Sequence, residues 1–233
     1  MLAVLEKPDA ETPALLSSDA AYEWIKRRII TNGFHPGTPL DERSIALELD
    51  ISRTPVREAL QRLKSEGFVD ILPRKGIFVK LLSRDNLRDL YQVVTSVEVM
   101  AVGLIAERRP SRAETDSLNT ICDAMADAIK AGDMHHWTEV DEAFHRRLLD
   151  LSGNPALIKV GYAYRDLSQR AHFVADRARP EGTQAASLKA HRKLVKTLAS
   201  GDPERARQEH FEQRETGARK LLAAIDGLGI SVL

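Results

Sequence analysis

Apolar residues in the first third of the chain repeat at the spacing of amphipathic helices and then alternate as in strands. Three short helices are expected to begin near Ser17, Asp41 and Ser52, and Asp41 and Ser52 are residue types that favour a helix N-cap. Two runs rich in β-branched and aromatic residues follow, at residues 68–72 and 76–79, and predict a hairpin. Three helices followed by a hairpin predict a winged helix-turn-helix with a small β-hairpin wing.

Beyond Leu81 the strand signal disappears and helical periodicity continues to about residue 226. A long helix is expected over residues 87–104. Later helices are expected to begin near Ser111, Met134, Asn154, Glu181 and Asp202. The predicted fold is therefore mainly α: a flexible N-terminal arm over residues 1–16, a winged helix-turn-helix over 17–82 and an all-α helical bundle over 84–226.

Charge and cysteine content narrow the function mainly by exclusion. Basic and acidic residues are equal in number, so any DNA-binding face depends on where the charge is placed. The single cysteine, Cys122, excludes an intrachain disulfide and favours a reducing compartment. No apolar run has the length of a membrane span, and the first residues do not resemble a secretory signal. We expect a soluble cytoplasmic protein with no membrane partner.

The third expected helix carries the side chains that reading duplex DNA requires. Arg53 and Arg57 lie four residues apart on the face opposite the apolar stripe, where they can reach the major groove. Thr54 lies in the first turn, where a hydroxyl and backbone N–H groups can contact a phosphate. Arg43 in the preceding helix is placed to grip the DNA backbone. An alternative is that these arginines form only a solvated helix face.

The expected hairpin ends in a basic turn. Arg74 and Lys75 lie at its tip beside Gly76, and a basic tip of this kind can enter the minor groove. The full order of elements, rather than the arginines alone, is what favours DNA binding.

Residues 38–79, and above all SRTPVREAL at 52–60, resemble the GntR family of transcription regulators. In that family the recognition-helix arginines and threonine, an arginine of the previous helix and the wing glycine contact DNA. The resemblance assigns these roles to Arg43, Arg53, Thr54, Arg57 and Gly76, in agreement with their placement above.

The second part of the chain resembles the FadR-type C-terminal domain of the same family, the FCD domain. The matching segments are residues 90–98, 141–145, 152–155 and 191–202. Together the two resemblances cover nearly all of residues 20–225. They imply an all-helical domain that dimerises and binds a small-molecule effector.

Candidate metal ligands occur on two of the expected helices. Asp141 and His145 are four residues apart, so a carboxylate oxygen and an imidazole nitrogen can reach the same point. His191 lies among apolar residues and is expected to point inward as well. In metal-binding FCD proteins an Asp and three His hold a divalent ion with the effector against it. The resemblance assigns the first three positions to Asp141, His145 and His191, and the ion would be zinc, nickel or manganese.

The chain departs from the family pattern at two positions. Gln213 stands where the family has its last histidine ligand, so Gln213 is expected in the effector cavity as a weak, neutral group. His210, one helical turn earlier, would serve only if the helix shifted. Val94 stands where many relatives carry an arginine near the cavity, so an anchor for an effector carboxylate is missing there.

Two interpretations of the Asp141, His145 and His191 set remain besides a metal-and-effector site. The three residues can form a plain hydrogen-bonded pocket. They can also be the ligands of a metal-dependent hydrolase, because catalytic zinc sites use three protein ligands and an open position. No Glu lies in a His-Glu-x-x-His pattern to act as general base, and such an enzyme would leave the DNA-reading module unused.

The sequence does not indicate whether His172 faces the cavity or the solvent. A further alternative, an architectural DNA-binding protein with no effector, would not explain polar residues that face inward in the bundle. We therefore expect a transcription regulator, in the family's commoner arrangement a repressor. As a homodimer it would bind palindromic operator DNA and respond to a small, carboxylate-type effector.

Overall fold

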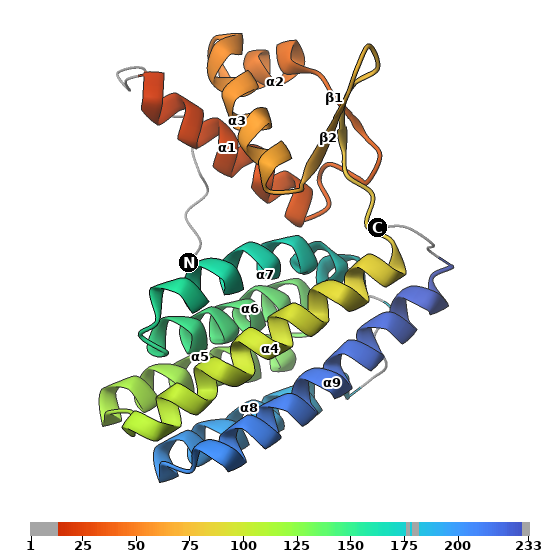
Figure 1. Ribbon diagram of the computed structural model, residues 1–233. Helices are drawn as coiled ribbons and strands as arrows, with labels where there is room; N and C mark the ends of the chain where they lie inside the picture. The colour runs from red at the N-terminus through yellow and green to blue at the C-terminus, as the bar shows by residue number, and fades with distance from the viewer. Residues whose placement is uncertain (1–13, 176–177, 179–181, 230–233) are drawn as a thin grey trace. The chain divides into compact units, whose positions relative to one another are not determined.

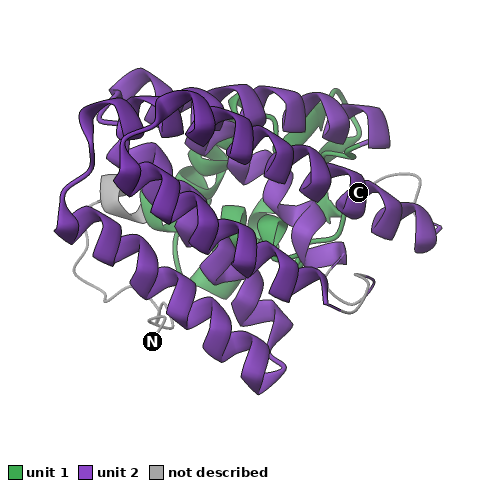
Figure 2. Ribbon diagram, turned by 90° about the horizontal axis from the view of Figure 1, so that it is seen from below, with its two compact units in different colours: residues 1–82, 232–233 green, residues 83–231 purple. Residues whose placement is uncertain are grey.

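The computed structural model describes residues 14–175, 178 and 182–229, and these form two compact units that divide at residue 82 (Figures 1 and 2). Residues 1–13 of the expected arm lie outside the described part. Residues 14–16 do not belong to an arm, because the first helix, α1, spans Ala14–Ile30 and so begins before Ser17. The mainly α fold with an N-terminal winged helix-turn-helix is confirmed.

The first unit packs three helices against one another through small apolar faces. Helix α2 spans Glu42–Leu49 and α3 spans Arg53–Ser65. The core of the three helices comprises the buried residues Ala21, Ile25, Ile29, Ile45, Ala46, Leu49, Val56, Ala59, Leu60 and Leu63. Asp41 caps α2 by accepting a bond from the backbone N–H of Ser44 at 2.8 Å, as its residue type predicts. Ser52 stands at the N-cap of α3, but its side chain makes no capping bond.

The wing is a three-stranded antiparallel sheet rather than the two-stranded hairpin that was expected. Strands β2 (Val69–Leu72) and β3 (Gly76–Val79) pair as predicted, and β1 (Pro39–Leu40) adds to the free edge of β3 with Leu40 opposite Ile77. Strand β1 was not expected from the sequence. Two residues are too short a run to show strand periodicity, so their pairing with β3 is visible only in three dimensions.

The second unit is a bundle built around one central helix, α4, which spans Arg84–Arg108. The other helices of this unit are α5 (Arg112–Ala131), α6 (Met134–Leu151), α7 (Pro155–Ala175), α8 (Thr183–Ser200) and α9 (Pro203–Gly227). Helix α4 contacts α6, α7, α8 and α9 (Figure 1). Glu181, where a helix start was expected, lies outside the described residues, and α8 begins at Thr183.

Helix α4 is long and apolar enough to cross a membrane by length and composition, unlike any other helix in the described residues. Half of that apolar window is buried inside the bundle, and a fully buried carboxylate, Glu98, lies in the middle of the helix. These features are typical of the core helix of a bundle. The apolar content of α4 therefore follows from its packing against four neighbouring helices.

Close approach between α6 and α7 depends on a glycine. A Cβ atom placed on Gly161 of α7 would lie 2.6 Å from Cδ1 of Leu149, which is fully buried on α6. In contrast, Gly217 of α9 has open space where a Cβ would stand. The two helical glycines differ in their surroundings, although both lie within helices of the same bundle.

We expect Gly161→Ala to lower the free energy of unfolding by about 1 kcal/mol, because the added methyl overpacks the α6–α7 contact. Gly217→Ala is the matched control and is expected to raise it by roughly 0.5–1 kcal/mol through helix propensity. Urea denaturation of both variants measures the two effects. Equal changes in both variants would contradict the packing role of Gly161.

Candidate functional site

The first unit presents a polar surface on the outer face of α3. Arg53, Thr54 and Arg57 are exposed, while Val56 and Leu60 on the opposite face are buried. The alternation follows the helical period, so the buried stripe that holds α3 in the unit also fixes which side chains face outward. The structure thus brings these three candidate DNA-contacting residues together on one face.

Most of the basic side chains that we expect to contact DNA make no ion pair with an acidic side chain of the described residues. Arg53 contacts Glu42 at 3.5 Å but is 69% exposed, so this ion pair is weak. Among the described residues Arg43, Arg57, Arg74 and Lys75 make no ion pair at all, and all four are exposed. Their positive charge is therefore available to an external anion.

The hairpin tip is shaped by backbone conformations that few residues accept. Arg74 has φ 65° and Gly76 has φ 107°, and the backbone N–H of Lys75 donates to the carbonyl of Leu72 at 3.1 Å. A side chain at Gly76 would be strained in this region of backbone space. The glycine therefore lets the turn close with Arg74 and Lys75 at its end.

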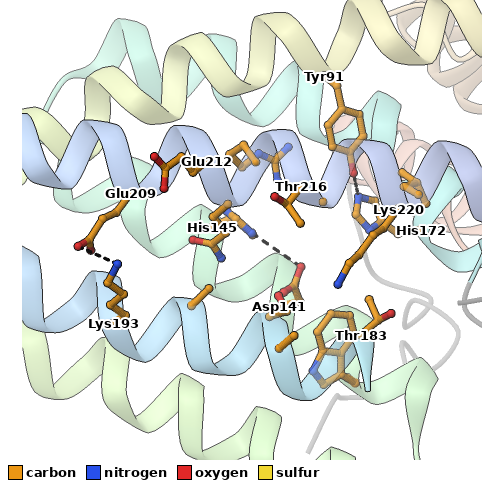
Figure 3. A pocket seen from close by; sticks show the side chains of 18 residues that line it. Tyr91, Asp141, His145, His172, Thr183, Lys193, Glu209, Glu212, Thr216 and Lys220 are labelled. Carbon is orange, nitrogen blue, oxygen red and sulfur yellow. Dashed lines mark hydrogen bonds and ion pairs between the residues drawn. The ribbon is translucent and has the colours of Figure 1, made fainter. Parts of the chain in front are cut away.

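The second unit contains a cavity of about 300 Å³ between α4, α6, α7, α8 and α9 (Figure 3). This volume lies at the small end of the range for small-molecule sites. Of the residues expected at an effector site, Asp141, His145 and Gln213 line the cavity, and His191 lies against Asp141 and Gln213. His172, whose side was open in the sequence, lines it too and bonds the hydroxyl of Tyr91.

Asp141, His145 and His191 converge on one point. Nε2 of His191 lies 3.4 Å from Oδ1 of Asp141, and Nε2 of His145 lies 3.8 Å from Oδ2. The ligating atoms of the three residues all lie within 4.8 Å of one another, and all three residues are buried. Asp141 and His145 of α6 therefore lie next to His191 of α8, as we expected from the i, i+4 spacing and from the apolar surroundings of His191.

A residue that the sequence analysis missed, Glu98 of α4, fixes the orientation of His145. Glu98 is fully buried, and its Oε2 lies 2.9 Å from Nδ1 of His145 and 2.9 Å from Nε2 of His210. Arg165 donates to Oε1 of Glu98, and Nε of Arg214 lies 3.5 Å from Oε2. Burial alone would raise the pKa of the Glu98 carboxyl. The neighbouring side chains of Arg214, His145 and Arg165 instead hold this pKa well below its usual range.

The protonation of the two imidazoles follows from these partners. An ionised carboxylate only accepts hydrogen bonds, so Nδ1 of His145 carries the hydrogen that it donates to Glu98. Nδ1 of His191 likewise donates to the backbone carbonyl of Ser187 at 2.7 Å. Burial lowers the pKa of His145 to about 3 and also lowers the pKa of His191, so both rings are neutral at pH 7.

Both Nε2 atoms are consequently without hydrogen, and both face Asp141. Two imidazole lone pairs and a carboxylate oxygen that face one another form a set of acceptors to which a cation can bind. Neutral imidazoles and a carboxylate are the ligand forms that zinc, nickel and manganese bind. The donor set therefore fits a divalent ion at Asp141, His145 and His191.

The two departures from the family pattern have distinct surroundings in the structure. The side-chain amide nitrogen of Gln213 lies 3.4 Å from Nε2 of His191, so Gln213 borders the three-residue site. His210 is fully buried but bonds Glu98, so it belongs to a different cluster from Asp141 and His191. Val94 is fully buried and offers no polar group.

Charged side chains beyond Glu98 extend this polar network between α6 and α7. Arg165 is 3% exposed and donates to Glu142 through Nε at 3.1 Å. Glu142 also accepts a bond from Nε of Arg146 at 2.7 Å, and Arg146 in turn contacts Asp166. The only sequence signal for this network was a charged residue, Glu98, at a core-facing position of an apolar helix.

The comparisons with protein families agree with this two-unit architecture. A model described as "Bacterial regulatory proteins, gntR family" matches residues 17–79, and the FCD domain model matches residues 89–213, which is more than half of the chain. A winged helix-turn-helix joined to such a helical domain defines a transcription regulator. The chain belongs to the GntR family, in its FCD-containing subgroup, the FadR subfamily.

Curated relatives are regulators as well. An uncharacterised HTH-type transcriptional regulator in the TAR-I ttuE-ttuC' intergenic region of Agrobacterium vitis is 39% identical over 132 residues, covering 56% of this chain and 77% of that one. The Nta operon transcriptional regulator of Aminobacter aminovorans is 35% identical over 142 residues, covering 60% of this chain and 64% of that one.

Among solved structures, E. coli McbR/YncC is similar with a TM-score of 0.77, 21% identity, and coverage of 88% of this chain and 96% of that one. At this identity the likeness shows the fold alone. Relatives and fold are those of regulators, which are not enzymes, and nothing in the comparisons supports the hydrolase alternative. The thiol of Cys122 does not supply a nucleophile either, because burial raises its pKa to about 11.

We expect the metal-free protein to lose stability as the pH falls below about 6.5. In the unfolded chain His145 gains a proton near pH 6.5, whereas in the folded chain its pKa is about 3, so acid favours unfolding throughout that window. His145→Gln should flatten the pH dependence between pH 6 and 5 by about 1 kcal/mol per pH unit.

Urea denaturation with a chelator present measures this slope. His135→Gln is the surface control, because His135 lies on the same helix and its side chain is 60% exposed. An unaltered slope in His145→Gln would mean that His145 is charged in the folded state.

Proposed function

We propose that the protein is a homodimeric repressor that binds palindromic operator DNA and releases it when a small carboxylate binds in the helical unit. The observation that carries the proposal is the presence of an exposed basic face on α3 and, in a separate helical unit, of a cavity lined by buried polar side chains. A face for DNA and a cavity for a ligand are what a ligand-controlled regulator needs. The protein would act in the cytoplasm.

For DNA binding, we assign base and phosphate contacts in the major groove to Arg53, Thr54 and Arg57, because they lie together on the exposed face of α3. Arg43 would contact the DNA backbone. Arg74, Lys75 and Gly76 would bring the wing to the minor groove, since the turn holds two exposed cations at its tip.

Dimerisation is supported by an apolar surface on the helical unit. Val93 and Met100 on α4 and Val160 and Tyr164 on α7 are between 36% and 49% exposed, and α4 and α7 are packed against each other. Exposed apolar groups that gather on neighbouring helices are typical of protein–protein contacts. A second copy of the chain covering this surface would pair two DNA-reading units for a palindrome.

For the effector site, we propose that Asp141, His145 and His191 hold one divalent ion, with Gln213 beside it. The ion would supply a positive charge against which a carboxylate ligand binds. Repression relieved by ligand is the arrangement we favour, and two relatives, GlaR and RspR of E. coli, are named repressors. Binding changes operator affinity only if the ligand favours one arrangement of the dimer over another.

Operator binding tests the α3 assignment. With an operator selected from random duplexes by the protein itself, Arg53→Ala and Arg57→Ala are each expected to weaken binding about tenfold or more, because each removes a forked donor. Arg27→Ala is a charge-matched control, since Arg27 is exposed in the last turn of α1. Fluorescence anisotropy at several salt concentrations measures the affinities. Unchanged affinity in both α3 variants, or equal losses in all three, would refute the assignment.

Elemental mass spectrometry tests the metal assignment on protein purified without a histidine tag or chelators. Wild type and the surface variant His135→Ala are expected to carry stoichiometric zinc, nickel or manganese, and His145→Ala to lose it while still binding the operator. The reason is that His145 supplies one of three ligating atoms. If wild type carries no metal, the cluster is a hydrogen-bonded pocket without an ion.

A further inference from the structure

Arg214 of α9 is a buried cation whose hydrogen-bonding capacity the protein itself does not use. The residue is 6% exposed and lines the cavity. Its Nε lies 3.5 Å from Oε2 of Glu98, and its guanidinium carbon lies 4.9 Å from the centre of the Tyr91 ring. Within the described part of the chain, no nitrogen of Arg214 donates a hydrogen bond. The Nε atom is itself buried and has no hydrogen-bond partner.

A role as counter-ion to Glu98 does not account for this geometry. Glu98 already receives bonds from His145, His210 and Arg165, and Arg214 approaches it only through Nε at a distance too long for a hydrogen bond of ordinary strength. Buried donors without partners are costly. The N–H groups on the two terminal nitrogens of Arg214 remain for another acceptor.

The charges around the cavity indicate what that acceptor is. Three acidic and three basic residues line the cavity: Asp141, Glu209, Glu212, Lys193, Arg214 and Lys220. Lys193 is paired with Glu209 at 3.1 Å. Lys220 reaches from α9 into the cavity (Figure 3) and makes no ion pair with any described residue. Among the described residues, neither Arg214 nor Lys220 of α9 therefore makes a hydrogen bond to an acidic side chain.

We propose that Arg214 is the anion anchor of this cavity: its terminal nitrogens bind a carboxylate of the ligand, with Lys220 as a second positive charge. This inference rests on the proposed effector function and specifies how that cavity selects its ligand. A second polar group of the same ligand faces Asp141, His145 and His191. The ligand class is a small organic acid with a further oxygen substituent.

A carboxylate fits this site better than a phosphate. The guanidinium carbon lies 4.9 Å from the centre of the Tyr91 ring, and the unbonded terminal nitrogens form a fork from which a planar carboxylate can accept two parallel bonds. The cavity also carries as many acidic as basic side chains. A singly charged carboxylate therefore adds less negative charge to this balanced set of side chains than a phosphate dianion does.

The arginine side-chain resonances of the ¹⁵N-labelled full-length protein test the proposal. The Arg214 Nε–Hε signal is the one that disappears in Arg214→Lys. Acetate, lactate, malonate, succinate and malate are titrated, with lactamide and succinamide as neutral counterparts and inorganic phosphate as the competing anion. We expect at least one hydroxy- or dicarboxylate to shift the Arg214 signal saturably, and the amides and phosphate not to do so.

Affinity is then measured by the ligand-induced rise in Tm. Arg214→Gln is expected to bind the selected carboxylate about tenfold or more weakly, because it loses a charge-assisted forked contact. Arg214→Lys keeps a charge beside Glu98, so it should fold as wild type yet still bind more weakly. Arg219→Gln is the matched control, since Arg219 is exposed on α9 and does not line the cavity.

The proposal is overturned if no carboxylate shifts the Arg214 signal, if phosphate alone shifts it, or if Arg214→Gln and Arg214→Lys bind as wild type does. Should a carboxylate bind equally to those variants but weakly to His145→Ala, the cavity is the effector site and only the anchor role of Arg214 fails. Should it bind through Arg214 without changing operator affinity, the anchor stands and the proposed regulation fails.

Discussion

The helical unit depends on one constraint: an ionised carboxylate, Glu98, is fully buried in the middle of its central helix. A buried charge is tolerated only when it is paired and hydrogen-bonded. The partners of Glu98 come from three other helices: His145 from α6, Arg165 from α7, and His210 and Arg214 from α9. Helices α6, α7 and α9 are therefore held to α4 by directional contacts as well as by apolar packing.

This constraint also prepares the cavity chemistry. Because Glu98 accepts the Nδ1 hydrogen of His145, the other ring nitrogen is left bare on the side of Asp141. The carbonyl of Ser187 does the same for His191. Nε of Arg214 lies 3.5 Å from the same Glu98 oxygen, and its terminal nitrogens are unbonded beside the cavity. One carboxylate thus lies next to both the proposed metal ligand His145 and the proposed anion anchor Arg214.

Local patterns in the sequence predicted the parts of the fold that depend on short-range physics. Helical periodicity, the cap at Asp41 and the exposed arginines of α3 are properties of neighbouring residues, and the structure contains each of them. The i, i+4 pair of Asp141 and His145 was visible for the same reason. Strand β1 was missed because two residues show no period and form a strand only through pairing with β3.

The charged network was not predictable in the same way. Glu98, Arg165 and Arg214 are 49 or more positions apart along the chain, and helical spacing does not say which buried charge meets which. A lone acidic residue on the buried face of α4 indicates that partners exist, but not where they come from. For the same reason the sequence showed that the family's arginine is missing at Val94, but not that Arg214 of another helix borders the cavity.

The tautomer of His145 tests most directly whether Glu98 prepares this cavity for a cation. It is measured from the ¹⁵N shifts of the two ring nitrogens in metal-free protein at pH 7. We expect a neutral ring that carries its hydrogen on Nδ1 and none on Nε2, and that loses this preference in Glu98→Gln. A hydrogen on Nε2, or a charged imidazolium in wild type, would contradict the claim that Glu98 prepares this cavity for a cation.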